Sequence, residues 1–274
     1  MKKVILAFDG AHFSEGAFEF AKKLNEKQRI LLTGIFLPQV NYANLWSYAS
    51  PAPGTLSIPL VEESNQQAIE KNIAQFESLC REGAIDYTVH KDFFNLALPE
   101  LADETRFADL AILGSETFYA NLGAEKPNEY LKDILHAAEC PVMVVPEKFH
   151  FPTSNILAYD GSESSVFAIK QFAYLFPSFH YNETLLVSVQ KENGSAIPHE
   201  QYIEELVSRH FPRLTMLKLK KDRQEDFTGW LHNRKNPVIV TGAFGRSFFS
   251  QLFKKSFISE VIREHRLPVF ITHR

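Results

Sequence analysis

The sequence predicts an α/β protein made of two tandem, doubly wound parallel-sheet domains. The chain has 274 residues, which suits two domains of ordinary size. A short segment near the N-terminus recurs near the middle of the chain, and each half also ends in a similar way. Between these markers, short apolar segments alternate with segments of helical periodicity. That alternation favours parallel strands joined by right-handed crossovers.

The repeat is clearest at the two ends of each half. Residues 5–10 read ILAFDG and residues 156–161 read ILAYDG, so only the aromatic residue differs. Serine and alanine then follow at equal spacing, as Ser14 and Ala17 in one copy and Ser165 and Ala168 in the other. The halves close with CPVMVV at 140–145 and LPVFIT at 267–272. Matching starts and ends in the same order indicate a duplicated domain.

The first half contains five short and mostly apolar segments, which are typical of strands covered on both faces. The helix that follows the first strand begins at Ser14, a good capping residue. A second helix is expected over Val61–Arg81 and a third over Leu96–Phe107, where apolar residues recur at helical spacing. The expected strands are Val4–Phe8, Ile30–Phe36, Ile85–His90, Leu110–Gly114 and Val142–Val145.

The second half repeats this order, and a short polar-aromatic linker, Glu147–Thr153, separates the two. The predicted domains are therefore residues 1–147 and 153–274. Both final strands are so apolar that an open edge would be hazardous, which predicts that they pair and that the halves pack face to face as a pseudo-dimer. The expected strands are Ile156–Tyr159, Leu185–Val189, Leu214–Leu219, Val238–Gly242 and Val269–Thr272.

One segment of the first half has a much shorter counterpart in the second. Pro38–Pro59 is rich in Asn, Ser, Tyr and Pro. We interpret it as a mobile or partner-bound loop in which Tyr42, Trp46 and Tyr48 could anchor a contact, with a plain solvated surface loop as the alternative.

Composition excludes several classes of protein. The net charge is −4 and the basic residues are spread along the chain, so nucleic-acid binding is not expected. No apolar run is long enough to span a bilayer, and the apolar N-terminal run stops at Asp9 without a cleavage site. We therefore expect a cytoplasmic protein without a membrane partner.

Catalytic and metal-binding patterns are missing from the sequence. The two cysteines, Cys80 and Cys140, make neither a disulfide framework nor a metal cluster, and the histidines show no ligand spacing. No nucleophile elbow is present. The sequence therefore predicts no metal site, no catalytic residue and no enzymatic activity.

Aspartates follow the first strand of each half, in Asp9-Gly10 and Asp160-Gly161. Ligands of an open parallel sheet bind beyond the carboxyl ends of the strands, where the strand order reverses. A carboxylate there could accept hydrogen bonds from an adenine amino group or a ribose hydroxyl. The alternative is that each aspartate only opens the turn into the next helix.

Glycines follow the fourth strand of the second half. Gly242 and Gly245 would let backbone N–H groups approach an anion, and Arg246 would add positive charge. Further along, Lys255 and Ser256 precede a helix whose N-terminus suits phosphate. This pattern differs from a P-loop, which requires Gly-Lys-Ser/Thr at a fixed distance.

These features together resemble the universal stress protein family over essentially the whole chain, twice. Its ATP-binding branch carries two glycines separated by two residues, nine more residues, and then glycine with serine or threonine. Gly242, Gly245 and Ser256 match, while Lys255 stands where glycine is expected. The resemblance implies an adenine-nucleotide alpha-hydrolase-like fold and ATP or AMP as ligand, with Mg²⁺ accompanying ATP. It also implies Asp160 and Gly161 as adenosine contacts and backbone bonds from Val189 to the base.

The first half departs from this pattern. Gly114 matches the first glycine, but Thr117 replaces the second, and Glu116 and Glu125 would place negative charge near any phosphate. We therefore expect a stress-response regulator with one nucleotide site, in the second half. The alternative is an interaction module that has lost nucleotide binding and acts on an unidentified protein partner. Whether the whole chain forms a homodimer stays open.

Overall fold

The structure is a computed structural model that describes residues 1–8, 12–36, 63–91, 97–114, 135, 137–190, 196–220, 236–242 and 267–272. The predicted loop Pro38–Pro59 lies outside these residues. The first half contains β1 (Lys2–Phe8), α1 (Glu15–Lys27), β2 (Ile30–Phe36), α3 (Glu63–Glu82), β3 (Asp86–Lys91), α4 (Ala97–Arg106), β4 (Leu110–Gly114) and β5 (Val142–Val145). The second half contains β6 (Ser154–Ala158), α7 (Glu163–Leu175), the 3-10 helix η1 (Pro177–Phe179), β7 (Glu183–Gln190), α8 (Glu200–His210), β8 (Leu214–Lys220), β9 (Pro237–Gly242) and β10 (Val269–Thr272).

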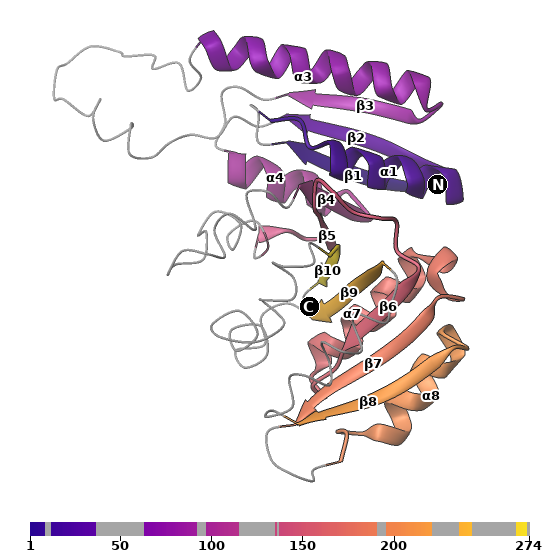
Figure 1. The fold of residues 1–274 in the computed structure, drawn as a ribbon. Helices are drawn as coiled ribbons and strands as arrows, with labels where there is room; N and C mark the ends of the chain where they lie inside the picture. The colour runs from indigo at the N-terminus through magenta and orange to yellow at the C-terminus, as the bar shows by residue number, and fades with distance from the viewer. Residues whose placement is uncertain are drawn as a thin grey trace, which may run out of the picture.

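All of these strands form one sheet, in the order β3-β2-β1-β4-β5-β10-β9-β6-β7-β8. Within each half, neighbouring strands are parallel. Figure 1 shows β3 and α3 at one end of the molecule and β8 and α8 at the other, with β5 and β10 in the middle. The predicted fold of two doubly wound parallel halves is confirmed.

The two halves join through their final strands. β10 pairs with β5 in antiparallel orientation, with Val269 opposite Val144 and Phe270 opposite Met143. All residues of both strands are buried, so this pairing removes the two apolar edges that prompted the pseudo-dimer prediction. One detail of that prediction was wrong. The halves meet edge to edge in a continuous sheet rather than face to face.

Most strands agree with their predicted positions to within a few residues, because their side chains are buried on both faces. β4 and β9, for example, are buried along nearly their whole length. β3 differs, because it alternates between exposed and half-buried residues instead of being uniformly covered. It lies at the end of the sheet, where β2 is its one neighbour among the described strands. The division at residues 1–147 and 153–274 remains a proposal.

The first helices of the two halves begin differently. Ser14 caps α1, as predicted, and its side chain accepts a hydrogen bond from the Ala17 backbone N–H. In the second half the cap is Ser162, which accepts from Ser165. Since Ser165 is the repeat partner of Ser14, α7 begins about one turn earlier than α1.

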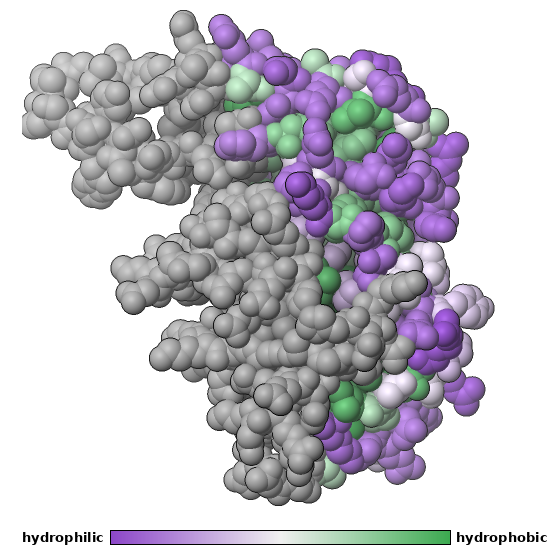
Figure 2. Space-filling view, viewed as in Figure 1, coloured by the Kyte–Doolittle hydropathy of each residue, from purple (hydrophilic) through white to green (hydrophobic). Residues whose placement is uncertain are grey.

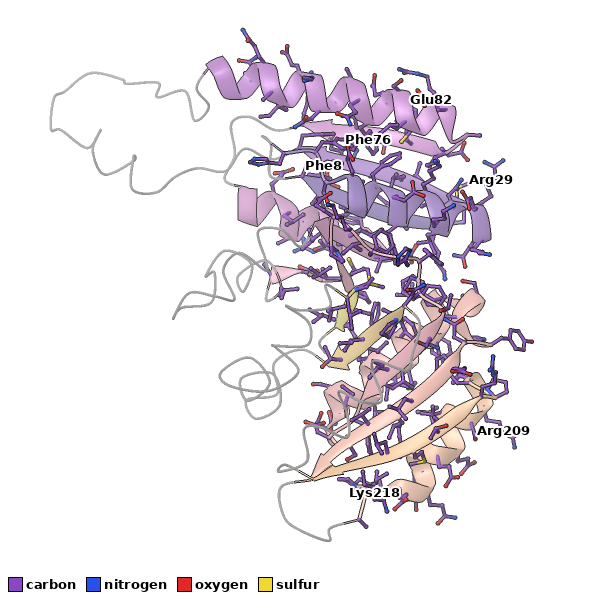
Figure 3. The ribbon with its side chains drawn as sticks, in the orientation of Figure 1. Phe8, Arg29, Phe76, Glu82, Arg209 and Lys218 are labelled. Carbon is purple, nitrogen blue, oxygen red and sulfur yellow. The ribbon has the colours of Figure 1, made fainter. Side chains whose placement is uncertain are left out.

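Aromatic side chains fill much of the core. In the first half, Phe8 stacks on Phe36 with ring centroids 4.7 Å apart and meets Phe76 of α3 edge-on at 6.0 Å. Figure 3 labels Phe8 and Phe76 where they lie between α3 and the strands. In the second half, Phe172 of α7 contacts Phe176, Phe179, Phe211 and Phe270.

One face of the molecule can be followed in the space-filling view. On the side shown in Figure 2, the described residues are mostly hydrophilic, and hydrophobic residues form small separate patches. Across the part of the chain that the structure describes, no helix combines the length and apolar character needed to cross a membrane.

Candidate functional site

The candidate site lies at the carboxyl edge of β6 and β9 in the second half. These strands are parallel neighbours, and β7 lies on the other side of β6, so the strand order reverses here. Among the predicted binding residues, Asp160 and Gly161 follow β6, Gly242 ends β9, and Val189 lies near the end of β7, where its backbone pairs with Leu219. The other four predicted residues, Gly245, Arg246, Lys255 and Ser256, lie outside the described residues.

A tight turn follows β6. The Asp160 carboxylate accepts a hydrogen bond of 2.9 Å from the Ser162 backbone N–H, which closes the turn into α7. Gly161 has a φ of +84°, a conformation that favours glycine, and a Cβ atom there would lie 2.5 Å from Cβ of Pro198. The turn-opening role weighed for Asp160 is therefore present in the structure.

Tyr159 ties this turn to the loop that precedes α8. Its hydroxyl donates a hydrogen bond of 2.8 Å to the Pro198 carbonyl, and its backbone N–H donates to Val187 of β7. Burial raises the pKa of this phenol, and the nearby Asp160 carboxylate raises it further. The hydroxyl thus remains a neutral donor at ordinary pH, and Tyr159, which has no hydroxyl-bearing counterpart in the first half, anchors the wall of the candidate site.

Gly242 is explained by close packing. A Cβ atom at this position would lie 2.7 Å from the Ser165 backbone nitrogen and 2.5 Å from the Ser164 carbonyl oxygen. The end of β9 can therefore lie against the first turn of α7 only because residue 242 has no side chain. The sequence singled out this glycine for anion binding, but the packing against α7 is a sufficient reason for it.

The equivalent edge of the first half contains a carboxylate that the sequence did not predict. Glu147 accepts hydrogen bonds from the Ser14 hydroxyl at 2.5 Å and from the Gly16 backbone N–H at 3.0 Å. Gly114, the counterpart of Gly242, lies beside this pair, because a Cβ there would be 2.5 Å from Ser14 Oγ and 3.7 Å from Glu147 Oε1. Asp9 lies outside the described residues. A usable signal was the repeat itself, which places Gly16 where the second half has Phe167.

The two halves also differ at matching positions of their second strands. In the register of β1 with β2, Phe8 lies opposite Phe36. In the register of β6 with β7, Ala158 lies opposite Val187, so the residue that corresponds to Phe36 is Ser188. The first half thus fills this part of its edge with stacked aromatic rings, whereas the second half has a small, buried hydroxyl side chain.

A groove of about 470 Å³ runs between α7 and α8 beside this edge. Its lining includes Tyr159 and Gly161 from the turn after β6, Lys170 of α7, and His199 and Tyr202 at the start of α8. The lining combines apolar residues with the charged side chains of Glu163 and Lys170 and with the exposed ring of Tyr202.

The described side chains offer little for metal or redox chemistry. Within the described ranges, no three His, Cys, Asp or Glu side chains are grouped so that they could hold a metal ion. Cys80 and Cys140 are buried, and burial raises the pKa of both thiols to about 12. Burial therefore favours the protonated form of both thiols, which is the weaker nucleophile.

Comparison with known proteins was made over the whole chain. No family model matches it. The chain is 23% identical over 286 aligned positions to Universal stress protein Slr1230 of Synechocystis sp., which covers 98% of this chain and 99% of that protein. The crystal structure of a universal stress protein from Archaeoglobus fulgidus superposes with a TM-score of 0.68 at 14% identity, over 100% of this chain and 96% of that one.

Fold and site together define a tandem α/β protein whose two halves share one sheet through their final strands. Within that class, the chain is similar to the universal stress proteins along its whole length, in sequence and in fold. The resemblance predicted from the sequence motifs is confirmed.

Proposed function

We propose that this chain is a non-enzymatic, stress-response regulatory protein that binds ATP or another adenine nucleotide in its C-terminal half. The stress-response role is supported by the names of its relatives. Nucleotide binding is supported by the sequence motif at Gly242, Gly245 and Ser256 and by the position of Asp160 at the switch point of the sheet.

The observation that carries the choice of half is the exchange of Phe36 for Ser188. Phe36 is fully buried in a stack with Phe8, so two phenylalanine rings occupy this part of the sheet edge in the first half. Ser188 at the matching position leaves the second half without that stack and adds a hydroxyl. A planar base can be accommodated more easily where the second-strand position holds a small serine instead of a second, stacked aromatic ring.

In this proposal Asp160 and Gly161 contact the adenosine, and the backbone of Val189 bonds the base. Gly245, Arg246, Lys255 and Ser256 hold the phosphates, with Mg²⁺ bound alongside ATP. Lysine at position 255 replaces a glycine of the family pattern, and its charge would favour the phosphates while its bulk would not.

Titration calorimetry with ATP tests this proposal on the parent chain and three variants. We expect Gly245→Val to weaken binding more than tenfold, because lost backbone N–H bonds to a charged group cost about 1.5–3 kcal/mol each. Asp160→Ala should weaken binding too, whereas the matched control Asp9→Ala should leave it unchanged. Equal losses from the two aspartate variants would contradict the assignment to the second half.

A second candidate is an interaction module without nucleotide. It is favoured by exposed aromatic side chains on the second half, since Tyr181 is 77% and Tyr202 74% exposed. Mass spectrometry of small molecules that remain bound through purification separates the two. An adenine nucleotide supports the first candidate, and a parent chain that neither retains nor binds one supports the second.

A further inference from the structure

The chain leaving β5 crosses directly over the N-terminus of α1. A Cβ atom on Gly16 would lie 2.6 Å from Cα of Glu147 and 2.9 Å from its carbonyl oxygen. Those contacts are with backbone atoms, so a side chain at position 16 would force the two segments apart. Gly16 therefore permits a crossing that Phe167, its repeat counterpart in α7, would not.

The Glu147 carboxylate lies where α1 lacks the first turn that α7 has. It accepts from the Ser14 hydroxyl and from the Gly16 backbone N–H, at 2.5 and 3.0 Å. The first N–H groups of a helix have no partner within the helix, and the N-terminus carries partial positive charge. A carboxylate held there by two hydrogen bonds satisfies both requirements.

The linker residues after Glu147 contact both halves of the protein. Phe149 and Phe151 lie 5.9 and 5.4 Å from the ring of Phe20 in α1. Phe151 also meets Phe179 of η1 edge-on at 5.4 Å. The Thr153 backbone N–H then donates to the Asn236 carbonyl beside β9, at 3.0 Å. The contacts of the segment therefore reach from α1 to the start of β9, while Lys148, His150 and Thr153 are exposed.

We propose that residues 146–153 form a strap that holds the two halves together, and that Glu147 is its anionic latch. The carboxylate serves as an internal anion at the N-terminus of α1 and fixes the point where the strap crosses Gly16. Because Phe151 links α1 to η1, fixing that crossing also fixes how the second half sits against the first helix. This role does not depend on nucleotide binding.

The test compares Glu147→Ala with Glu147→Gln in the full chain. Loss of the carboxylate should lower the thermal midpoint by on the order of 5 °C in both variants, since hydrogen bonds to charged groups are among the stronger ones. Formate, exchanged for chloride at constant ionic strength, should restore part of the loss in Glu147→Ala, where space is open. It should restore nothing in Glu147→Gln, where the amide fills that space.

The matched control is Glu19→Ala, which removes an exposed carboxylate from α1. It should change the midpoint little and show no specific response to formate. Hydrogen exchange gives a local readout, because the Gly16 amide should lose protection in Glu147→Ala, which has no acceptor there, and regain part of it with formate.

Parent-like protection of Gly16 in Glu147→Ala, or an equal effect of formate on every chain, would overturn the proposal. If Glu147→Ala does not fold, the thermal midpoint of Glu147→Gln decides. A midpoint equal to that of the parent would exclude the anionic latch, because the amide keeps an acceptor oxygen and loses only the charge.

Discussion

At the scale of single residues, the presence of glycine at the ends of β4 and β9 can be explained in two ways, by ligand binding or by packing. Gly114 and Gly242 occupy matching places, and each lies against the start of the first helix of its half. A motif pattern assigns Gly242 to phosphate binding, whereas the contacts assign it to packing. The two roles are compatible, because close approach of strand and helix also brings the helix N-terminus to the edge of the sheet.

The packing role predicts that Gly242→Ala destabilises the protein even without nucleotide. The new methyl group would press on backbone atoms of Ser164 and Ser165, so α7 must move, at a cost of about 1–3 kcal/mol. Urea unfolding of the parent and the variant measures this. The control is Gly83→Ala, where the nearest atom would be the Leu79 carbonyl oxygen at 3.2 Å. Similar midpoints for the two variants would contradict the packing explanation.

At the scale of elements, the end of α8 forms a titratable contact with α7. His210 lies 5.5 Å from the ring of Tyr174 and 5.9 Å from that of His180. Burial lowers the pKa of His210, and the charge of His180 lowers it further. The folded state therefore prefers the neutral imidazole.

The lowered pKa of His210 sets the sign of a pH effect. Below the ordinary histidine pKa of about 6.5, the unfolded chain takes up a proton more readily than the folded one, so this contact costs stability as the pH falls. We expect His210→Gln to lose less stability than the parent between about pH 7.5 and pH 5. Thermal midpoints at the two pH values measure the difference. An identical fall of the thermal midpoint in both chains would show that His210 contributes nothing to the loss of stability at low pH.

At the scale of the whole molecule, Lys2 joins the first strand to the first helix of the other half. Its ammonium group donates hydrogen bonds to the carbonyls of Tyr174, at 3.1 Å, and Leu175, at the C-terminus of α7. α7 has no basic residue in its own last turn, so Lys2 supplies the cation that this end of a helix favours.

Replacing Lys2 should therefore weaken the whole assembly. We expect Lys2→Met to cost about 1–2 kcal/mol, because two carbonyls lose a charged donor and the helix loses its compensating charge. Lys23→Met, which removes a surface partner of Glu19 and Glu26, should change stability by less than about 0.5 kcal/mol. Urea unfolding of both variants measures the two free energies of unfolding. Equal losses would mean that the contact of Lys2 with α7 stabilises the protein no more than a surface ion pair does.

Much of this organisation could be predicted from the sequence alone. The strands, their alternation with helices, the duplication and the pairing of the final strands follow from local hydrophobic patterns and from an internal repeat. β3 was the exception. The sequence predicted a strand covered on both faces, but β3 lies at the end of the sheet and its residues are exposed or half-buried. For the candidate site, the sequence predicted Asp160, Gly161 and Gly242 because they follow strands in recognisable motifs, and their role in binding stays a prediction.

Only the tertiary structure decided which distant residues hold the two halves together and which side chains fill each edge. Contacts of Glu147 with Ser14 and Gly16, and of Lys2 with α7, join residues more than a hundred positions apart. The exchange of Phe36 for Ser188 becomes visible only when the strand registers are compared. Sequence patterns report each segment's own preference for helix, strand or turn. Which distant charge caps a helix, or which ring fills an edge, depends on how the segments pack against one another.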